Sequence, residues 1–364
     1  MKFSISKEKL INIFTELSNV VKENTVRPYL SGVLITINNN LVTFKCTCVD
    51  MDLIIKEECI NCENGEVLVR PNIILEYIKL VDEDFINIEK RDGYLIVNNA
   101  EFSIMNEESF PEIIENLALT ICKKNSSELI DMFEKVKFVS STDSTHQVLN
   151  SIKLVFNEDN TELIATDSYR LIYFIHKSKN IVKEEVIIPI ESVNAICKLI
   201  KNFDGEVLIG VCDSNLVLNW GNSYFNSKLI NNEYPNFRNI MENYQFKMEA
   251  EANKNDLKSA LKRVISVTKN SDDSKYSAIF NFNQKNLSIS GFSGGAKTNQ
   301  NIDIIKSGED LRISMNCKII LDFLEKINGN MIIRGSGPKS MLKLTEINKD
   351  DYIYFFMPIN TGNK

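Results

Sequence analysis

Hydrophobic and polar positions follow the same order three times along the chain. Each repeat opens with an alternating run, which predicts a strand, and continues with apolar residues three or four positions apart, which predict an amphipathic helix. The openings begin at Met1, Leu117 and Phe246, so the repeat is about 120 residues long. These first helices are expected at 7–22, 126–137 and 254–269. Asn253 or Asn255 is a candidate N-cap of the third.

Each opening is followed by two alternating runs joined by an asparagine-rich turn, which is typical of a β-hairpin. The hairpins are expected within 30–47, 149–166 and 276–290. A second amphipathic helix follows in each repeat, at 72–82, 190–202 and 317–327, and further strands complete the repeat.

Two boundaries between repeats carry an aromatic residue followed by proline, at Phe110 and at Tyr234. A residue before proline favours an extended chain, so we expect an extended linker at each boundary. The pattern predicts three similar domains of the α+β class, each with two helices on antiparallel sheets. Their expected bounds are 1–115, 116–243 and 244–364.

Composition is that of an ordinary globular protein, with 364 residues, 43% of them hydrophobic and 25% charged. No run of apolar residues is long enough to predict a membrane span, and the first residues lack the apolar core of a signal peptide. Eight scattered cysteines suit a reducing compartment. We therefore expect a cytoplasmic protein with no membrane contact.

The net charge of −7 argues against a protein that binds nucleic acid over its whole surface. Its distribution is uneven, because the six expected helices carry +4 together and leave −11 for the rest of the chain. Most of this positive charge lies in the helix at 254–269. A basic helix within an acidic protein is compatible with a local contact to phosphates, although ordinary solvated helix charges are the alternative.

The sequence also carries six short motifs in a fixed order. They are Met1-Lys2-Phe3, Arg27-Pro28 with Leu30, Asp50-Met51-Asp52, Ala165 to Leu171, Ser227-Lys228-Leu229 with Tyr234-Pro235, and Met357-Pro358-Ile359. In this order they resemble the bacterial sliding clamp family, the β subunit of DNA polymerase III, over the whole chain. The resemblance implies that the three domains form half of a six-domain ring, closed as a head-to-tail homodimer.

The resemblance also implies the function. The ring encircles duplex DNA without reading its sequence, and it tethers the replicative DNA polymerase, which gains processivity through a high effective concentration at the primer end. Further implied partners are the clamp loader, repair polymerases and other proteins that carry a clamp-binding peptide. No catalysis and no cofactor are expected. The alternative is a divergent clamp paralogue that serves as a scaffold without a DNA role.

Carried over position by position, the resemblance implies three sets of site residues. A pocket for partner peptides, between the second and third domains, is lined by Leu149, Thr166, Ser168, Tyr169, Arg170, Leu171, Pro235, Asn239, Ile240, Phe355, Met357, Pro358 and Ile359. DNA contacts are expected from Arg27, Lys254, Lys258, Lys262 and Arg263. The dimer contact is expected from Phe102 and Ile104 against Val267.

Some of the pocket positions depart from the family pattern or have an alternative role. Ser168 stands where glycine is common, Asn239 and Asn360 stand where arginine is common, and Thr361 to Lys364 extend past the usual end. Ordinary core residues are the alternative for Leu149, Leu171 and Ile240, although the set as a whole favours the pocket.

Two other motifs point to chemistry that we do not expect. Residues 291–295 match G-x-S-x-G, but a nucleophile elbow needs a helix after Ser293 and a later histidine. A strand is expected at 301–305, and both histidines come earlier in the chain. The other motif is a cysteine pattern, at Cys46, Cys48, Cys59 and Cys62, which could suggest zinc, yet its spacing favours free, buried thiols.

Overall fold

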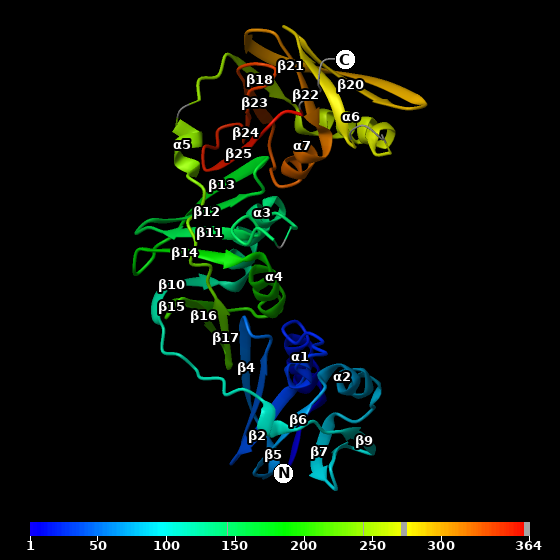
Figure 1. Ribbon diagram of the computed structural model, residues 1–364, viewed down its shortest axis with the longest axis vertical. Helices are drawn as coiled ribbons and strands as arrows, with labels where there is room; N and C mark the ends of the chain where they lie inside the picture. The colour runs from blue at the N-terminus through cyan, green and yellow to red at the C-terminus, as the bar shows by residue number, and fades with distance from the viewer. Residues whose placement is uncertain (144, 243, 271–274, 360–364) are drawn as a thin grey trace. The chain divides into compact units, whose positions relative to one another are not determined.

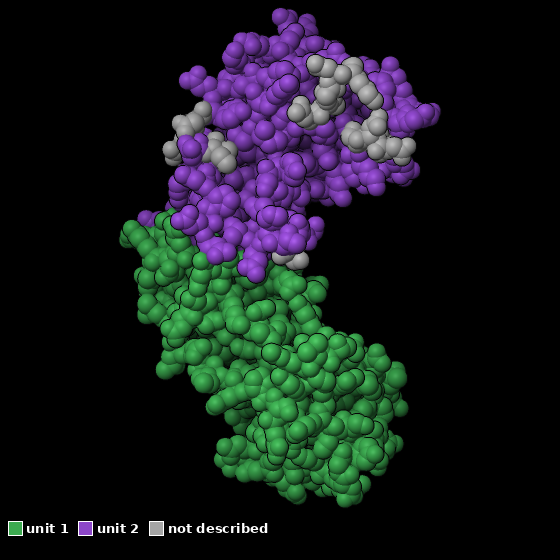
Figure 2. All heavy atoms as spheres, viewed as in Figure 1, with its two compact units in different colours: residues 1–133, 156–158, 179–231 green, residues 134–155, 159–178, 232–364 purple. Residues whose placement is uncertain are grey.

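The computed structural model describes residues 1–143, 145–242, 244–270 and 275–359. Two compact units emerge, the first from residues 1–133, 156–158 and 179–231, and the second from 134–155, 159–178 and 232–364 (Figure 2). These units divide the chain differently from the three expected domains, whose bounds therefore stay a prediction.

The order of elements repeats three times (Figure 1). The first repeat contains β1 (Lys2–Ser6), α1 (Lys7–Leu17), η1 (Pro28–Ser31), β2 (Val33–Asn38), β3 (Leu41–Thr47), β4 (Met51–Glu58), β5 (Ile60–Glu63), β6 (Gly65–Val69), α2 (Pro71–Leu80), β7 (Phe85–Arg91), β8 (Tyr94–Val97), β9 (Ala100–Ser103) and η2 (Glu107–Ser109). The second contains β10 (Leu119–Asn125), α3 (Ser126–Val136), η3 (Lys137–Val139), β11 (Ser151–Phe156), β12 (Asn160–Thr166), β13 (Arg170–Lys177), β14 (Glu184–Pro189), α4 (Ile190–Leu199), β15 (Glu206–Cys212), β16 (Asn215–Trp220) and β17 (Ser223–Lys228). After α5 (Phe237–Glu242), the third contains β18 (Met248–Ala252), α6 (Lys254–Thr268), β19 (Ser277–Phe282), β20 (Asn286–Ser293), β21 (Ala296–Gly308), β22 (Leu311–Asn316), α7 (Cys317–Leu324), β23 (Met331–Gly335), β24 (Leu342–Glu346) and β25 (Tyr352–Phe356). The α+β class is confirmed.

All six expected helices form, and side chains explain the start of α6 and the end of α1. Asn253 caps α6, because its side chain accepts hydrogen bonds from the backbone N–H groups of Asn255 and Asp256. The first helix was expected to reach residue 22 but ends at Leu17. Ser18 Oγ donates to the carbonyl of Phe14 at 2.7 Å, and such side-chain bonds compete with continuation of the helix.

Strands of neighbouring repeats pair with each other inside each unit. In the first unit one sheet has the order β5-β1-β7-β8-β9, and the other has the order β10-β15-β16-β17-β4-β3-β2-β6. There β17 pairs antiparallel with β4, from Ser223 opposite Ile55 to Ser227 opposite Met51. In the second unit β13 pairs antiparallel with β25 in the same way. We call these pairings the first and the second sheet junction.

A segment of chain covers one face of each junction with apolar side chains. At the first junction Ile113 packs with Ile54, Val217 and Tyr224, and Phe110 lies against this group. The Tyr224 hydroxyl accepts a hydrogen bond from the backbone N–H of Asn116 at 3.1 Å. The expected extended linker is observed here, since residues 110–118 contain no helix.

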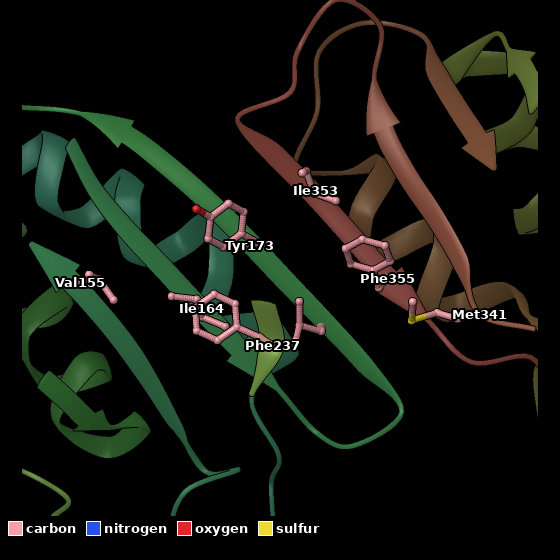
Figure 3. Packing of buried hydrophobic residues seen from close by; sticks show 8 residues of the cluster. Val155, Ile164, Tyr173, Phe237, Met341, Ile353 and Phe355 are labelled. Atoms are coloured by element: carbon pink, nitrogen blue, oxygen red, sulfur yellow. The ribbon is translucent and has the colours of Figure 1, made fainter. Parts of the chain in front are cut away.

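The second junction is covered by α5, which the sequence did not predict (Figure 3). Phe237 of α5 is buried in a cluster with seven residues of the strands and loops beneath it: Val155, Ile164, Leu171, Tyr173, Met341, Ile353 and Phe355. Arg238 holds the helix in place through an ion pair with Glu162 at 2.8 Å. The chain at Tyr234-Pro235 contains no helix, as expected of a linker, but α5 begins two residues after the proline.

The helices pack in pairs, α1 against α2 in the first unit and α6 against α7 in the second. Leu257, Leu261 and Val264 of α6 are fully buried. Gly291 of β20 allows α6 to approach closely, because a Cβ there would lie 2.8 Å from a methyl carbon of Val264. Every helix within the described ranges is too short or too polar to cross a lipid bilayer.

Glu16 of α1 is half-buried and carries an unusual carboxyl group. It borders a cavity of about 290 Å³ whose lining includes Asn19, Asn202 and Trp220. Within the described part of the chain its Oε2 atom is buried without a hydrogen-bond partner. Burial raises the pKa of this carboxyl to about 7.

Replacing Glu16 by Gln should stabilise the protein at alkaline pH. A carboxyl whose pKa is higher in the folded than in the unfolded state destabilises the fold as pH rises from about 4.5 through 7. We expect Glu16→Gln to raise the free energy of unfolding by about 3 kcal/mol at pH 8 but only by about 1 kcal/mol at pH 5. Urea unfolding at both pH values measures this, with exposed Glu8→Gln as the control, and an equal gain at both would contradict the assignment.

Candidate functional site

An open hollow of about 1060 Å³ lies in the second unit. Three parts of the chain form its walls: the turn between β12 and β13, the exposed side of α7, and the segment after β25. The lining residues are Phe138, Asp167, Ser168, Tyr169, Arg170, Tyr276, Asn316, Lys318, Ile319, Asp322, Glu325, Lys326, Met357, Pro358 and Ile359.

The turn between β12 and β13 is fixed by its own side chains. Asp167 Oδ1 accepts hydrogen bonds from the backbone N–H groups of Tyr169 and Arg170, both at 3.0 Å. Thr166 Oγ1 donates to the carbonyl of Arg170 at 2.8 Å. Ser168 has a φ of +77°, in the left-handed region that favours glycine. The glycine that is common in the family at this position therefore has a conformational reason.

Arg170 connects the turn to α7 and to β25. Its Nε donates to Asp167 Oδ2 at 2.8 Å, and its Nη1 donates to Asp322 Oδ2 at 3.3 Å. The same guanidinium donates to the Tyr354 hydroxyl at 3.4 Å and to the Phe138 carbonyl at 3.1 Å. With its side chain only 16% exposed, Arg170 acts as a brace inside the cavity wall.

Burial and neighbouring charges shift the pKa values of Arg170 and Asp322. Burial lowers the pKa of Arg170, but Tyr354 and Asp167 outweigh burial and hold that pKa above its ordinary value. Burial also raises the pKa of Asp322, and Arg170 opposes the shift. The guanidinium stays charged, and its bonds to carboxylates are of the strong, charge-assisted kind.

The exposed side of α7 supplies charged groups at the cavity rim. Asn316 caps α7 by accepting from the backbone N–H of Lys318 at 2.9 Å. The Lys318 ammonium lies 5.5 Å from the ring centre of Tyr276, and the Lys326 ammonium lies 5.7 Å from that of Phe138. These cation–π contacts hold both lysines over aromatic walls.

The segment after β25 and the neighbouring turn form an apolar lip. The backbone N–H of Met357 donates to the carbonyl of Tyr169 at 2.8 Å, and that of Ile359 donates to the carbonyl of Ser314 at 2.9 Å. Tyr169 is 71% exposed and Met357 is 43% exposed. A concave apolar surface with charged groups at its rim suits a ligand that inserts hydrophobic side chains.

Six of the thirteen expected pocket residues line this cavity: Ser168, Tyr169, Arg170, Met357, Pro358 and Ile359. Thr166 supports the turn from behind and is buried. Leu171 and Phe355 belong to the apolar cluster under α5, as Figure 3 shows for Phe355, so the alternative of an ordinary core role fits Leu171.

The remaining expected pocket positions lie elsewhere in the second unit. Pro235, just before α5, and Asn239, within α5, are both exposed. Ile240 lies within α5 with its side chain outside the described part. Leu149 is half-buried and its carbonyl accepts from the backbone N–H of Ser141. Asn360 and residues 361–364 lie outside the described residues.

Nine lining residues were absent from the expected set: Phe138, Asp167, Tyr276, Asn316, Lys318, Ile319, Asp322, Glu325 and Lys326. Five of them lie on or just after α7, whose other side buries Ile320, Phe323 and Leu324. Amphipathic spacing identifies that polar side as exposed. The spacing does not indicate that the turn between β12 and β13 faces this side of α7.

The expected DNA-contacting residues differ in how available their charges are. Arg27 is exposed at the start of η1, and Lys262 and Arg263 are exposed on α6. Lys258 lies 3.6 Å from Glu325, and the Lys254 ammonium donates to the carbonyl of Ile327. The positive charge of these two lysines is therefore partly compensated by groups within their own unit.

The residues expected at the dimer contact are all half-buried. In the first unit Phe102 lies on β9, the last strand of its sheet, with its ring 5.6 Å from that of Tyr77 on α2. Ile104 follows β9 directly. In the second unit Val267 lies on α6.

The structure places the residues of the two chemical motifs that the sequence analysis set aside. Ser293 ends β20 and is followed by a turn and β21, so no helix follows it. Cys46 and Cys59 are buried free thiols, while Cys48 and Cys62 are half-buried. Among the described residues, no three or more His, Cys, Asp or Glu side chains are grouped to hold a metal ion.

Comparison with known proteins assigns the family. Models for the N-terminal and central domains of the DNA polymerase III beta subunit match residues 1–114 and 123–236. The Beta sliding clamp of Chlamydia muridarum is 25% identical over 92% of this chain and 92% of its own length. That of Bacillus subtilis is 23% identical over 99% of this chain and 100% of its own. The chain belongs to the bacterial sliding clamp family.

Solved clamp structures share the whole fold. The DNA polymerase III beta subunit of Thermotoga maritima superimposes with a TM-score of 0.92 at 18% identity, covering 99% of this chain and all of its own. The beta subunit of Pseudomonas aeruginosa gives a TM-score of 0.91 at 21% identity, with 99% and 100% coverage. The sliding clamp family supplies processivity to DNA replication and is not catalytic.

The strained turn of this clamp gives a direct test of the cavity wall. A side chain at positive φ costs about 1–2 kcal/mol, and a β-branched one costs most. We expect Ser168→Gly to leave the free energy of unfolding unchanged or raise it by up to about 1 kcal/mol, and Ser168→Val to lower it by about 1–2 kcal/mol. Urea unfolding measures both, and Ser307→Val on an exposed strand is the control. Tolerance of valine at 168 equal to that at 307 would contradict the conformation.

Proposed function

We propose that this protein is a ring-forming DNA sliding clamp, two copies of which close head to tail around duplex DNA. The ring tethers the replicative DNA polymerase, and it also receives the clamp loader, repair polymerases and other proteins with a clamp-binding peptide. It works in the cytoplasm, where bacterial DNA lies. Family membership supports this role, and the relatives match nearly the full length of the chain.

The observation that carries the docking role is the cavity beside the turn at 166–170. Its lip is apolar and exposed at Tyr169 and Met357, and exposed apolar surface of this kind usually marks an interaction site. The fixed turn and the Arg170 brace keep the wall rigid, which lowers the entropic cost of binding. A short peptide with hydrophobic anchors is the ligand class that fits.

One related structure supports a ligand site in this fold. A sliding clamp from Pseudomonas aeruginosa, 21% identical to this chain with a TM-score of 0.90, has been solved bound to griselimycin. A clamp of the same fold can therefore hold a ligand.

The DNA role rests on the positive charge of α6. Lys262 and Arg263 are exposed neighbours on one helix, and Arg27 adds an exposed charge at η1. Contacts of this kind attract the phosphate backbone without selecting a sequence, as sliding requires. The acidic remainder of the chain limits nonspecific binding over the other surfaces.

Self-association is supported by an apolar surface on α2 beside Phe102. Ile73 and Leu80 are 58% and 83% exposed, and they share one side of α2 with Tyr77. A monomer gains nothing from leaving these side chains in water, whereas a second copy can cover them.

Replacing Met357 and Pro358 together by alanine should weaken peptide binding at least tenfold, since both line the cavity lip. Fluorescence anisotropy with a labelled clamp-binding peptide from the replicative polymerase measures this. Ile181→Ala, which removes an exposed apolar side chain in the first unit, is the control. Unchanged affinity in a folded double variant would rule out this cavity as the docking site.

A closed ring should be retained on circular DNA and lost from linear DNA, because the link is topological. Loading onto nicked circular DNA by a bacterial clamp loader with ATP, followed by gel filtration before and after linearisation, measures this. Lys262→Glu combined with Arg263→Glu should reduce loading, and Lys285→Glu should not. Retention on linear DNA would indicate static binding, and a monomer at micromolar concentration in native mass spectrometry would contradict the ring.

A further inference from the structure

Two cysteines beside the end of β4 lie in direct contact. Cys59 follows β4 directly, and Cys62 lies within β5. Their Sγ atoms are 2.6 Å apart. The backbone N–H of Cys59 donates to the carbonyl of Asn40 at 2.9 Å, which ties this end of the strand to the turn between β2 and β3. Neither the docking role nor the DNA role uses this pair of thiols.

A β-bulge in β5 brings the two sulfurs together. In a regular strand, residues three positions apart point to opposite faces. The chain takes three steps from Ile60 to Glu63, whereas the paired part of β1 takes two, so β5 carries one extra residue. Asn61, at the bulge, has a φ of +53°, in the left-handed region. The bulge therefore turns Cys62 back towards Cys59.

Hydrogen bonds from two other strands hold the bulge in this shape. The Asn61 amide donates to Ser4 Oγ at 3.4 Å, and Ser4 Oγ donates to Asn87 Oδ1 at 2.6 Å. Ser4 lies on β1 and Asn87 on β7, the next two strands of the same sheet. Bulges often lie beside functional sites, because they change the direction of a side chain. Here the side chain that is redirected is a thiol.

The two sulfurs differ in their access to solvent. Cys59 is only 5% exposed, whereas Cys62 is half-buried between the exposed residues Asn61 and Glu63. The strand that carries Cys62 is the end strand of its sheet. Burial raises the pKa of the Cys59 thiol, and the contact with Cys62 adds to this rise. A reagent in solution therefore meets Cys62 first.

The separation of the sulfurs distinguishes a disulfide from a metal site. Two thiolates bound to one zinc ion, each at about 2.3 Å and at a tetrahedral angle, lie about 3.8 Å apart. The Sγ atoms of Cys59 and Cys62 are much closer than that, and only a small further approach brings them to the bond length of a disulfide, about 2.05 Å. Across the described ranges, no third His, Cys, Asp or Glu side chain joins them as a metal ligand.

We infer that Cys59 and Cys62 form a thiol–disulfide exchange site that a low-molecular-weight disulfide oxidises. The Cys62 thiolate attacks one sulfur of this reagent, whose S–S bond breaks and releases one thiolate. Cys59 then gives its proton to solvent and attacks the Cys62 sulfur of the mixed disulfide, which releases the second thiolate. The two cysteines lose two electrons and two protons, and the reagent is reduced to two thiols.

The bond would act locally, at the corner between the two sheets of the first unit. β4 belongs to the sheet that contains the first junction, and β5 belongs to the other sheet. The cross-link closes a loop of only four residues, so it restricts the unfolded chain little. Its main effect is to suppress local opening of the bulge in β5. Oxidation of the surroundings is thereby converted into lower mobility of one strand.

Reaction with oxidised glutathione tests the site. The reduced, full-length protein is incubated with oxidised glutathione, quenched in acid, digested with trypsin and analysed by mass spectrometry. We expect the peptide that holds both cysteines to lose two hydrogen atoms and to carry no glutathione, and we expect dithiothreitol to reverse the change. Cys212→Ser, which removes a half-buried thiol elsewhere, should react in the same way. Free thiols at 59 and 62, or glutathione retained on Cys62, would overturn the inference.

Serine variants test the order of attack. Cys59→Ser should keep one glutathione on Cys62, because the thiol that would release it is missing. In Cys62→Ser, the buried Cys59 should react at least about tenfold more slowly than Cys62 does in Cys59→Ser. Equal reactivity of the two single thiols would overturn the assigned roles.

Variants of Asn61 test whether the bulge builds the site. Asn61→Val disfavours the left-handed conformation and should slow disulfide formation about tenfold, whereas Asn61→Gly should leave the rate within about twofold. In the unmodified protein, oxidation should slow hydrogen exchange of the β5 amides about tenfold and leave that of β17 unchanged. Equal rates for valine and glycine, or unchanged exchange in β5, would contradict the role given to the bulge.

Discussion

Strand edges that need a partner are the constraint on which this molecule depends. Backbone N–H and C=O groups along an open edge must find hydrogen bonds. The chain meets that need by letting a strand of one repeat extend the sheet of its neighbour, as β17 does with β4 and β25 with β13. The second of these pairings also brings Met357 against Tyr169, so the cavity is a product of the junction. The same strand pairing therefore extends the sheet and forms one wall of the cavity.

Arg170 shows how closely the two are linked. Sequence motifs present it as a pocket residue, yet its guanidinium is already engaged by Asp167, Asp322, Tyr354 and the Phe138 carbonyl. A buried cation with this many partners is costly to disturb, because its removal leaves carboxylates unpaired. Its contribution to binding is to hold the cavity walls in position, while the apolar surface comes from Tyr169 and Met357.

Local spacing was sufficient to predict the class of fold, the six long helices and the three hairpins, because each depends on which side of an element is buried. It missed α5, since the proline at 235 indicated an extended chain and the burial of Phe237 depends on strands from two repeats. It also missed the α7 wall, because Lys318 and Lys326 are ordinary exposed helix positions until the turn at 166–170 faces them. The family motif identified that turn, and the positive φ of Ser168 explains why glycine is common at this position.

The covering segments at Phe110 and Phe237 have a consequence for how a ring could admit DNA. Each is part of the continuous polypeptide, so parting the strands beneath it would bare an apolar cluster and still leave a covalent bridge across the gap. Only a seam between two chains lacks such a bridge. In the proposed ring, chain connectivity alone would therefore confine opening to the boundary between subunits, whatever the relative strength of the individual contacts there.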